Sequence, residues 1–582
     1  DSITLKSVID QTVTPMGSRL MSKWILNPLL NKKDICDRQE YVKAFLLNET
    51  VRESVFNSIS EISDIERISS KIALKRASPR ELLFLKKSLI SAEDLKLQLK
   101  NSKEKVFNSW SSEVPDSKKI ISKIGSAIHE EASMLSSGKV IKDGYNTELD
   151  KLRKISNTGK DILLKIQNEE IERTGITSLK VAYNKVFGYY LEVTNAHKDK
   201  VPENWIRKQT LVNAERYITE ELKKYEESIL TADEKINEIE KTMFFEILND
   251  LCENIIVIQK TSKSIAFLDS VLSFANLAYS SNLSEPEITE EKVIDIKKGR
   301  HLIIESSLPP DELYIPNDVY LDNSSQQIIV ITGPNMSGKS AIIRQVALIV
   351  ILAQIGSYVP AESSKIGIVD KVFTRVGASD NISKGESTFM VEMMETSSIM
   401  NNLTDRSLVL MDEIGRGTST YDGISIAWSI VEYLHNQKEI RPKTLFATHY
   451  HELNQLEEKL DRVKNYNVSV EEINNEIIFL RKLVPGGSEH SFGINVAQLA
   501  GMPNKILIRA YEVLKELEKK PIKKNIKVKD SKKQNQLKLE YSNPDYEKAK
   551  KVIEDININN INPVQALVKL NEIIDIIKSS KN

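Results

Sequence analysis

Residues 328–340 read IIVITGPNMSGKS, and the C-terminal half of the chain is organised around them. Four β-forming residues lead into the pattern G-x-x-x-x-G-K-S, and residues 341–352, AIIRQVALIVIL, then predict a buried helix. In this setting the glycines let backbone N–H groups surround phosphate oxygens at a helix N-terminus. The predicted nucleotide-binding residues are Gly333, Pro334, Asn335, Met336, Ser337, Gly338, Lys339, Ser340 and Ala341.

A second apolar strand, residues 407–413 with the sequence SLVLMDE, ends in two acids. In a P-loop protein the lysine of the loop, Lys339, reaches the β- and γ-phosphates, and the Ser340 hydroxyl is a ligand for Mg²⁺. Asp412 is placed to hold the same Mg²⁺, and Glu413 can polarise the attacking water as a general base. The expected cofactors are therefore ATP and Mg²⁺.

A third strand, residues 444–449 with the sequence TLFATH, ends in His449, which is suited to sensing the γ-phosphate and is the third predicted catalytic residue beside Glu413 and Lys339. Ser387, in the stretch STFMVEM of residues 387–393, predicts a helix N-cap. A helix N-terminus is also an anion site. This arrangement resembles ABC-type ATPases, in which a signature helix of one subunit closes over the ATP of the other. It predicts that Ser387 binds nucleotide in trans.

Length and composition narrow the class of protein. The chain has 582 residues, which is too long for one hydrophobic core, and its net charge of −1 argues against a globally basic nucleic-acid binder. The two cysteines, Cys36 and Cys252, lie too far apart to support a disulfide framework or a zinc site. Neither a signal peptide nor a membrane span is expected, so the predicted location is cytoplasmic. Because the chain begins with Asp1, we expect a fragment.

The N-terminal half predicts helices, with segments over residues 51–68 and 79–99 and a long helix over 149–171. A second long helix has an alternating four-three seam, which is typical of a coiled-coil contact and consists of Ile218, Leu222, Tyr225, Ile229, Ala232, Ile236, Ile239 and Met243. Two long helices separated by about fifty residues of different composition suggest a pair of stalks with a small domain at the tip.

The predicted tip begins with residues 179–194, LKVAYNKVFGYYLEVT, which are rich in β-formers. This region has a local excess of positive charge, which suits contacts with the phosphate backbone of double-stranded DNA. An ordinary solvated surface is the alternative interpretation. The predicted DNA-binding residues are Lys180, Lys185, Lys198, Lys200, Arg207 and Lys208.

Several motifs in order resemble those of the MutS family of DNA mismatch-repair ATPases. They are TGPNMSGKS (332–340), FTRVGASD (373–380), STFMVEM (387–393), DEIGRGTSTYDG (412–423) and ATHY (447–450), with TVTPMGSRL (12–20), VFGYY (186–190) and RKQTLVNAERYI (207–218) upstream. The resemblance implies a multidomain α plus α/β protein. Its implied parts are a helical core and lever (1–144), lever tips and a DNA clamp domain (145–238), a returning lever (239–290), an ABC-type P-loop ATPase domain (291–517), a lysine-rich linker (518–541) and a C-terminal helical association region (542–582).

The resemblance also implies contacts that the residues alone do not indicate. Tyr314 occupies the position where the family stacks an aromatic ring on adenine, and Arg481 lies near the same base. Residues 491–494, SFGI, match a helix-turn-helix segment that braces the partner subunit. Residues 536–541, QLKLEY, faintly resemble a peptide that binds a sliding clamp. The implied partners are DNA, a second copy of the chain, a higher oligomer through the C-terminal region, and a MutL-type repair protein.

Two departures from the family pattern affect these expectations. Ala341 replaces the usual threonine, but the Mg²⁺ ligand Ser340 is retained. In the family a domain with a Phe-x-Glu motif reads the mispair and precedes the region that corresponds to residue 1, so we expect this chain not to read mismatches by itself. The alternatives are a recombination-type MutS relative, a chromosome-maintenance ABC-type ATPase and a helical scaffold with an inactive nucleotide fold. A chromosome-maintenance ATPase would need a coiled coil that splits the nucleotide domain.

Overall fold

The computed structural model describes residues 3–132, 139–184, 188–309, 311–334, 337–377, 388–473, 476–488 and 493–518 of the chain. The chain divides into two units, Asp1–Asn504 and Lys505–Asn582. Several predicted features lie outside the described residues: Asn335, Met336, Lys185, Ser387, Ser491, and everything from residue 519 onward, which includes the linker, the QLKLEY peptide and the C-terminal association region.

The first part of unit one is helical, and α11 (Ile255–Ser280) packs against α2, α3 and α5 at its centre. The helices that precede the two longest ones are α1 (Leu5–Ile9), α2 (Pro15–Leu26), α3 (Lys32–Leu47), α4 (Glu49–Ser60), α5 (Ile65–Ala73), α6 (Pro79–Lys100), α7 (Lys105–Glu113) and α8 (Lys118–Ala127). The continuous helix expected over residues 51–68 is divided into α4 and α5. The division arises because the carboxylate of Asp64 accepts a hydrogen bond from Arg67 N and thereby starts a new helix.

Residues 14–17, TPMG, at the start of α2 are held by a buried carboxylate from α11. Asp269 accepts hydrogen bonds from Val13 N (3.1 Å), Thr14 N (2.9 Å) and Thr14 Oγ1 (2.6 Å), and Thr14 in turn caps α2. Gly17 is required by this close approach, because a Cβ there would lie 2.2 Å from Asp269 Oδ2. The sequence signature near the N-terminus is therefore a packing device that joins α2 to α11.

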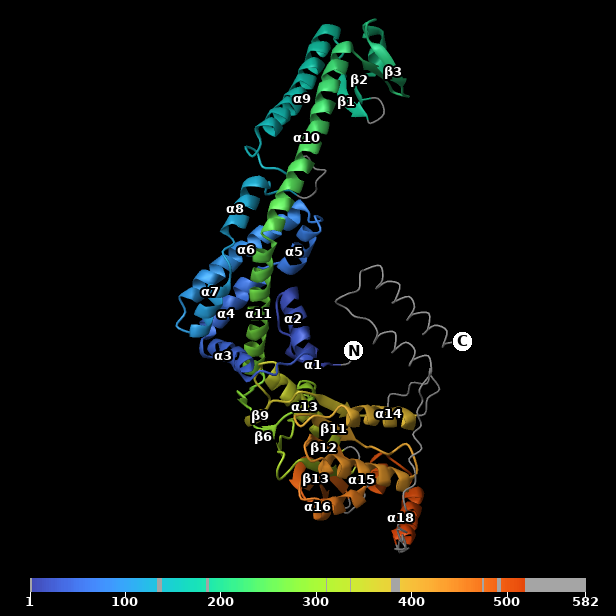
Figure 1. Ribbon diagram of the computed structural model, residues 1–582. Helices are drawn as coiled ribbons and strands as arrows, with labels where there is room; N and C mark the ends of the chain where they lie inside the picture. Colours follow the sequence, from blue (N-terminus) through green and yellow to red (C-terminus); the bar gives the residue numbers. More distant parts are fainter. Residues whose placement is uncertain are drawn as a thin grey trace, which may run out of the picture. The chain divides into compact units, whose positions relative to one another are not determined.

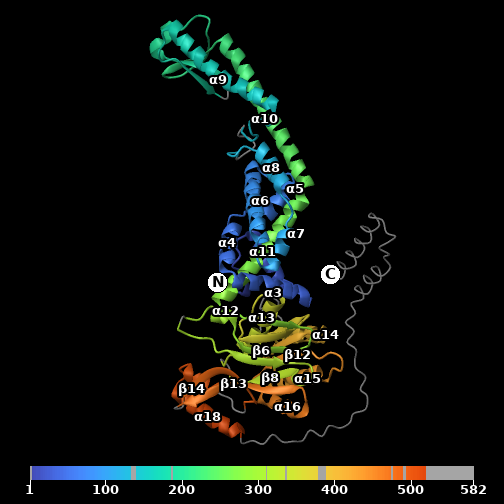
Figure 2. The same cartoon turned by 90° about the vertical axis from the view of Figure 1, so that its left-hand side faces the viewer.

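The two longest helices, α9 (Thr147–Thr174) and α10 (Glu220–Glu253), pack against each other and lie side by side in Figures 1 and 2. On α10 the seam residues Leu222, Ala232 and Ile236 are buried. A four-stranded antiparallel sheet, in the order β1-β2-β4-β3, packs on the ends of both helices. Its elements are β1 (Lys180–Asn184), β2 (Gly188–Thr194), η1 (Asn195–Lys200), β3 (Ile206–Thr210) and β4 (Ala214–Ile218).

The α/β part contains a six-stranded sheet in the order β10-β11-β12-β8-β13-β14, in which only the β13–β14 pair is antiparallel. Its strands are β8 (Ile328–Thr332), β10 (Val372–Arg375), β11 (Leu408–Asp412), β12 (Lys443–Ala447), β13 (Val463–Ile473) and β14 (Glu476–Pro485). A second sheet, β5-β9-β6-β7, is formed by β5 (Glu287–Thr289), β6 (Ile294–Gly299), β7 (Asn317–Leu321) and β9 (Ser363–Gly367). The expected mixture of helical and α/β domains is confirmed at this level.

Helix α13 (Lys339–Gln354) contacts strands of both sheets. The remaining elements of this part are α12 (Leu302–Glu305), α14 (Thr388–Asn401), α15 (Thr420–Asn436), η3 (His451–Gln455), α16 (Leu456–Lys459) and α17 (Gly493–Leu499). Helix α18 (Asn504–Glu518) belongs almost entirely to the second unit. No helix in the described part of the chain combines the length and the apolar character needed to cross a bilayer.

The helical part and the α/β part share one hydrophobic core, which runs from Ile9 to Leu483. The C-terminal end of α13 is fixed to the helical part by hydrogen bonds between side chains and backbone groups. Gln354 exchanges hydrogen bonds with Leu29, from Leu29 N to Gln354 O and from Gln354 Nε2 to Leu29 O, both 2.9 Å long. Arg38 Nη1 donates to Ile355 O at 2.9 Å.

Lys443, the first residue of β12, is fully buried. Within the part of the chain that the structure describes, its Nζ atom has no hydrogen-bond partner. The nearest carboxylates are engaged elsewhere, because Asp405 pairs with Lys292 and Asp370 accepts a hydrogen bond from Thr404 Oγ1. Burial lowers the pKa of Lys443 to about 8.

Candidate functional site

Three neighbouring parallel strands bring the predicted motifs together. The pairing register places Asp412 opposite Ala447, and Ala447 opposite Ile331, so β11, β12 and β8 end at one edge of the sheet. The loop after β8 is the P-loop, the turn after β11 carries Glu413, and the turn after β12 carries His449. This edge is where open α/β sheets place their ligands.

Two glycines of the predicted P-loop have backbone conformations that other residues rarely adopt. Gly333 and Gly338 have φ angles of +132° and +104°, which favour glycine, and α13 begins directly afterwards at Lys339. The Lys339 side chain is buried, and its Nζ donates to Gly333 O (2.7 Å) and Pro334 O (2.8 Å). Burial lowers the pKa of Lys339, and the negative charges of Glu413 and Asp412 partly oppose this shift.

The residues present fit a magnesium ion held jointly with phosphate oxygens. Asp412 is buried, and its Oδ1 atom has no hydrogen-bond partner among the described residues. Burial raises the pKa of Asp412, and a hydrogen bond with the Ser340 side chain opposes this shift. No group of three or more His, Cys, Asp or Glu side chains in the described ranges could hold a metal alone. Mg²⁺ commonly binds through one or two protein ligands, substrate phosphates and water, and Asp412 with Ser340 fits that arrangement.

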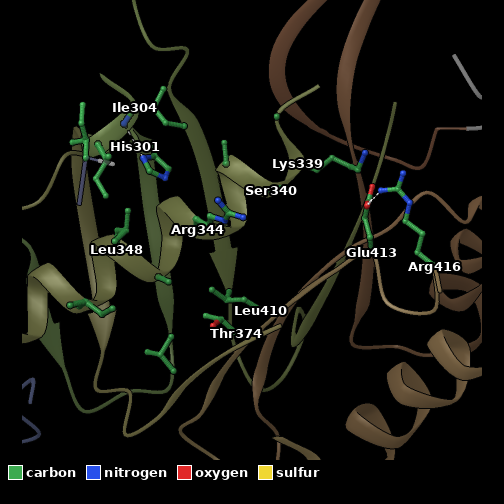
Figure 3. A pocket seen from close by; sticks show the side chains of 17 residues that line it. His301, Ile304, Lys339, Ser340, Arg344, Leu348, Thr374, Leu410, Glu413 and Arg416 are labelled. Carbon is green, nitrogen blue, oxygen red and sulfur yellow. Dashed lines mark hydrogen bonds and ion pairs between the residues drawn. The ribbon is translucent and has the colours of Figure 1, made fainter. Parts of the chain in front are cut away.

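Glu413 has an uncommon backbone conformation and an ionic partner. Its φ angle is +52°, and its N–H donates to Ala447 O at 2.9 Å. The carboxylate pairs with the guanidinium of Arg416, as Figure 3 shows. His449 is half-buried beside them, and burial lowers its pKa, which favours the neutral imidazole.

A cavity of about 900 Å³ extends from these groups along one face of α13. Lys339, Glu413 and Arg416 lie at one end of it in Figure 3, and His301 and Ile304 lie at the other. The face of α13 between the two ends carries Arg344 and Leu348.

The two residues expected beside adenine lie near this cavity without lining it. Tyr314 Oη donates to Gln345 Oε1 on α13 at 2.9 Å, and its ring centroid is 6.5 Å from that of His301. Burial raises the pKa of Tyr314 to about 12, and the nearby charge of Arg481 opposes the shift. Arg481 has a φ angle of +54°, and its carbonyl accepts a hydrogen bond from Asn317 Nδ2.

Sequence reasoning missed four residues that support this edge of the sheet. Arg416 pairs with Glu413, and Glu392 of α14 binds both Arg375 at the end of β10 and the backbone of Gly415. The fourth is Tyr450, whose hydroxyl donates to Gly415 O. All four stand inside the motifs quoted from the sequence, but their partners become evident only in three dimensions.

The candidate DNA contacts in the small sheet do not all lie on one face. The described members, Lys180, Lys198, Lys200, Arg207 and Lys208, are exposed. In the strand register Lys180 lies opposite Glu192, whereas Arg207 lies opposite Tyr217. The side chains of these two register pairs lie on opposite faces of the sheet. Tyr217 is on the face that packs on α9 and α10. Arg207 also forms an ion pair with Glu215 at 3.5 Å.

Comparison with known proteins agrees with the motifs. The family model described as MutS domain III matches residues 1–275, and the one described as MutS domain V matches residues 329–518. Proteins named DNA mismatch repair protein MutS from Cytophaga hutchinsonii and Bacteroides fragilis are 53% and 52% identical over 583 residues, which cover 99% of this chain and 68% of each relative. The MutS of Flavobacterium psychrophilum is 52% identical and covers 98% of the chain. The chain belongs to the MutS family of DNA mismatch repair proteins.

Proposed function

We propose that the protein acts in DNA mismatch repair and couples the binding and hydrolysis of ATP to the binding of DNA. The observation that carries the proposal is the convergence of the P-loop, Asp412, Glu413 and His449 at the ends of three adjacent parallel strands. Membership of the MutS family supplies the biological setting. The recombination-type and chromosome-maintenance alternatives have no support from the named relatives.

The groups at this edge of the sheet have distinct roles in hydrolysis. Backbone N–H groups of the P-loop and Lys339 bind the phosphates of ATP. Ser340 and Asp412 would hold Mg²⁺, which would neutralise developing charge on the phosphoryl oxygens. Glu413 activates the attacking water after its carboxylate leaves Arg416, and neutral His449 contacts the γ-phosphate as a hydrogen-bond partner. Tyr314 and Arg481 bind the adenine.

The nucleotide domain is of the ABC type and works as a dimer. Helix α14 begins at Thr388, and Ser387 immediately before it contacts the ATP held by the P-loop of the partner chain. The P-loop already supplies the N-terminus of α13 to its own phosphates, so a second anion site in the same domain serves a neighbouring nucleotide. Residues 491–494 brace the partner subunit.

The helical part transmits the nucleotide state to DNA. In this proposal α9 and α10 are levers, and β1–β4 form a clamp domain that contacts the DNA backbone through Lys180, Lys185, Lys198, Lys200, Arg207 and Lys208. Phosphate contacts position the duplex without reading its sequence. The proposed domains are 1–144, 145–238, 239–290, 291–517, the linker 518–541 and the association region 542–582.

Further partners follow from family membership. The protein forms a homodimer and a higher oligomer through its C-terminal region, signals to a MutL-type protein, and acts in the cytoplasm on the nucleoid. A sliding-clamp contact through residues 536–541 is the weakest of these proposals, because Glu540 stands where an aromatic side chain is expected.

The test mixes two variants that are each inactive, Lys339→Ala and Ser387→Arg. Mixed dimers contain one intact P-loop facing one intact Ser387, so ATP turnover should partly return. Lys339→Ala alone should also weaken ATP binding, because it removes a phosphate contact made before hydrolysis. If mixing restores no turnover, each chain hydrolyses ATP alone and the shared site must be abandoned. If Lys339→Ala hydrolyses ATP normally, the proposed ATPase site itself is wrong.

A further inference from the structure

The two peptide groups that flank the Cα of Gly415, two residues after Glu413, are each held by a buried side chain and are together called the Gly415 peptide. The Gly415 N–H donates to Glu392 Oε1 at 2.6 Å, and the Gly415 carbonyl oxygen accepts from Tyr450 Oη at 2.9 Å. Glu392 and Tyr450 are 6% and 5% exposed, so water competes weakly for either bond. Glu392 belongs to α14, and Tyr450 directly follows His449. The peptide therefore connects the helix proposed to face the partner's ATP with the chain's own hydrolytic groups.

Packing around this peptide leaves little free space. Gly415 has a φ angle of +86°, and a Cβ there would lie 2.7 Å from Gly423 Cα, at the start of α15. A Cβ on Gly417 would lie 3.0 Å from the Cβ of Phe389 on α14. The loop that follows Glu413 is thus pressed between α14 and α15, and neither helix can shift without displacing it.

Both ends of this connection are themselves fixed. Glu392 Oε2 lies 3.4 Å from Arg375 Nη2, and Arg375 is 4% exposed at the end of β10. The Tyr450 ring lies 4.1 Å, centroid to centroid, from the imidazole of His449. A buried carboxylate that lost Arg375 would be left with an unpaired charge, which is strongly unfavourable.

We propose that Glu392 and Tyr450 are positioning residues that couple the two ATP sites of the dimer. Through them, the hydrolysis rate at one subunit's P-loop depends on whether nucleotide is bound at the partner's P-loop, which the first subunit's α14 faces. This inference rests on the shared ATP site proposed above. A displacement of α14 moves the Glu392 carboxylate, the carboxylate moves the Gly415 peptide, and the peptide moves Glu413 and, through Tyr450, His449. These contacts are discrete hydrogen bonds in a packed region. Both sites therefore act on one common element, the Gly415 peptide, and not through many diffuse contacts.

The test uses mixed dimers with one working P-loop. When the partner carries Lys339→Ala, the working subunit's α14 faces an empty site, and the turnover per working site should differ from that of the intact dimer. Tyr450→Phe in the working subunit removes only the hydroxyl. We expect it to lower kcat about fivefold, the loss equivalent to one hydrogen bond, with KM for ATP unchanged. The response to emptying the partner's site should also disappear.

Two further variants separate positioning from folding. Tyr466→Phe is the matched control, because it removes a tyrosine hydroxyl bonded to Gln326 in the same domain but outside this connection. It should leave both kcat and the response intact. Glu392→Gln keeps an acceptor for Gly415 N–H but loses the charge, and its effect on the response should be non-additive with that of Tyr450→Phe.

The inference fails if Tyr450→Phe keeps the full response to the partner's empty site, even with a lower kcat, since its role would then be structural. It also fails if Tyr466→Phe abolishes the response equally. Failure of the proposed function is distinguishable, because in that case Lys339→Ala homodimers would still hydrolyse ATP.

Discussion

Replacing Lys443 with methionine should stabilise the nucleotide-binding sheet at neutral pH, although it deletes a charge. The ammonium group is fully buried without a hydrogen-bond partner in the described structure, and its pKa falls from 10.5 to about 8. A lysine whose folded-state pKa is depressed opposes folding at every pH below its unfolded-state pKa, and most strongly below the folded-state pKa, because the folded state must either bury the charge or release the proton. Methionine fills a similar volume and carries no charge.

The size of the effect follows from the pKa difference. A shift from 10.5 to about 8 corresponds to about 3 kcal/mol of lost stability at pH 7. Between pH 8 and pH 10.5 the unfolded state binds more protons than the folded state, so stability rises with pH across this window. At pH 9.5 the remaining penalty is about 1.4 kcal/mol by the same linkage relation. The advantage of Lys443→Met should therefore shrink as the pH rises.

Pulse hydrogen exchange along a urea gradient, read on the peptide that contains β12, reports the unfolding free energy of this sheet. Wild type and Lys443→Met are compared at pH 7 and pH 9.5. Lys371→Met is the control, because Lys371 is exposed nearby and should show no difference between the two pH values. A stability difference for Lys443→Met that is the same at both pH values would refute a buried, depressed lysine.

Three other changes have definite expected outcomes. Glu413→Ala should slow ATP hydrolysis about 10²–10⁴-fold with little change in ATP affinity, and equal losses in both measurements would contradict its role as general base. Lys208→Glu should weaken the binding of matched and mismatched duplexes alike and reduce the salt slope of binding by about one, whereas an unchanged slope would remove Lys208 from the DNA path. Gly17→Ala should cost about 1–3 kcal/mol in a urea titration because of the contact with Asp269, while Gly125→Ala on α8, which faces only the flexible Lys86 side chain, should not destabilise the protein. Equal effects of the two glycine changes would show that the Asp269 contact is unimportant.

The elements that sequence could predict are those specified by neighbouring residues. The strand at 328–332 and the helix that follows the P-loop depend on a local alternation between apolar runs and glycines, and both were expected within a few residues of β8 and α13. The two long helices were predicted from one apolar seam. Helix α9 extends beyond the predicted range 149–171 at both ends, and α10 continues past Met243 to Glu253. Helix α10 begins only at Glu220, because Ile218, the first residue of the predicted seam, is the last residue of β4.

Other features depend on contacts between residues distant in sequence or on strand register. Asp269 holds Thr14 from 255 positions away, and nothing in either stretch indicates the other. Lys180 and Arg207 were grouped by charge, yet pairing through β2 and β4 puts them on opposite faces of the sheet. The irregularity between Arg207 and Gln209 further alters that register, and a bulge of this kind has no reliable sequence signal.

Helix α13 begins directly after the predicted P-loop, and its other end is hydrogen-bonded to the helical part. Its sixteen residues make a rod about 24 Å long. Its C-terminal end is held by the two hydrogen bonds between Gln354 and Leu29 and by the hydrogen bond from Arg38 to Ile355 O. A Cβ at Gly356 would collide with Arg38 Cβ at 2.5 Å, so the end of α13 and Arg38 of α3 are closely packed. A tilt of α13 at its P-loop end should therefore displace α3, which packs against α11, the helix that directly follows α10.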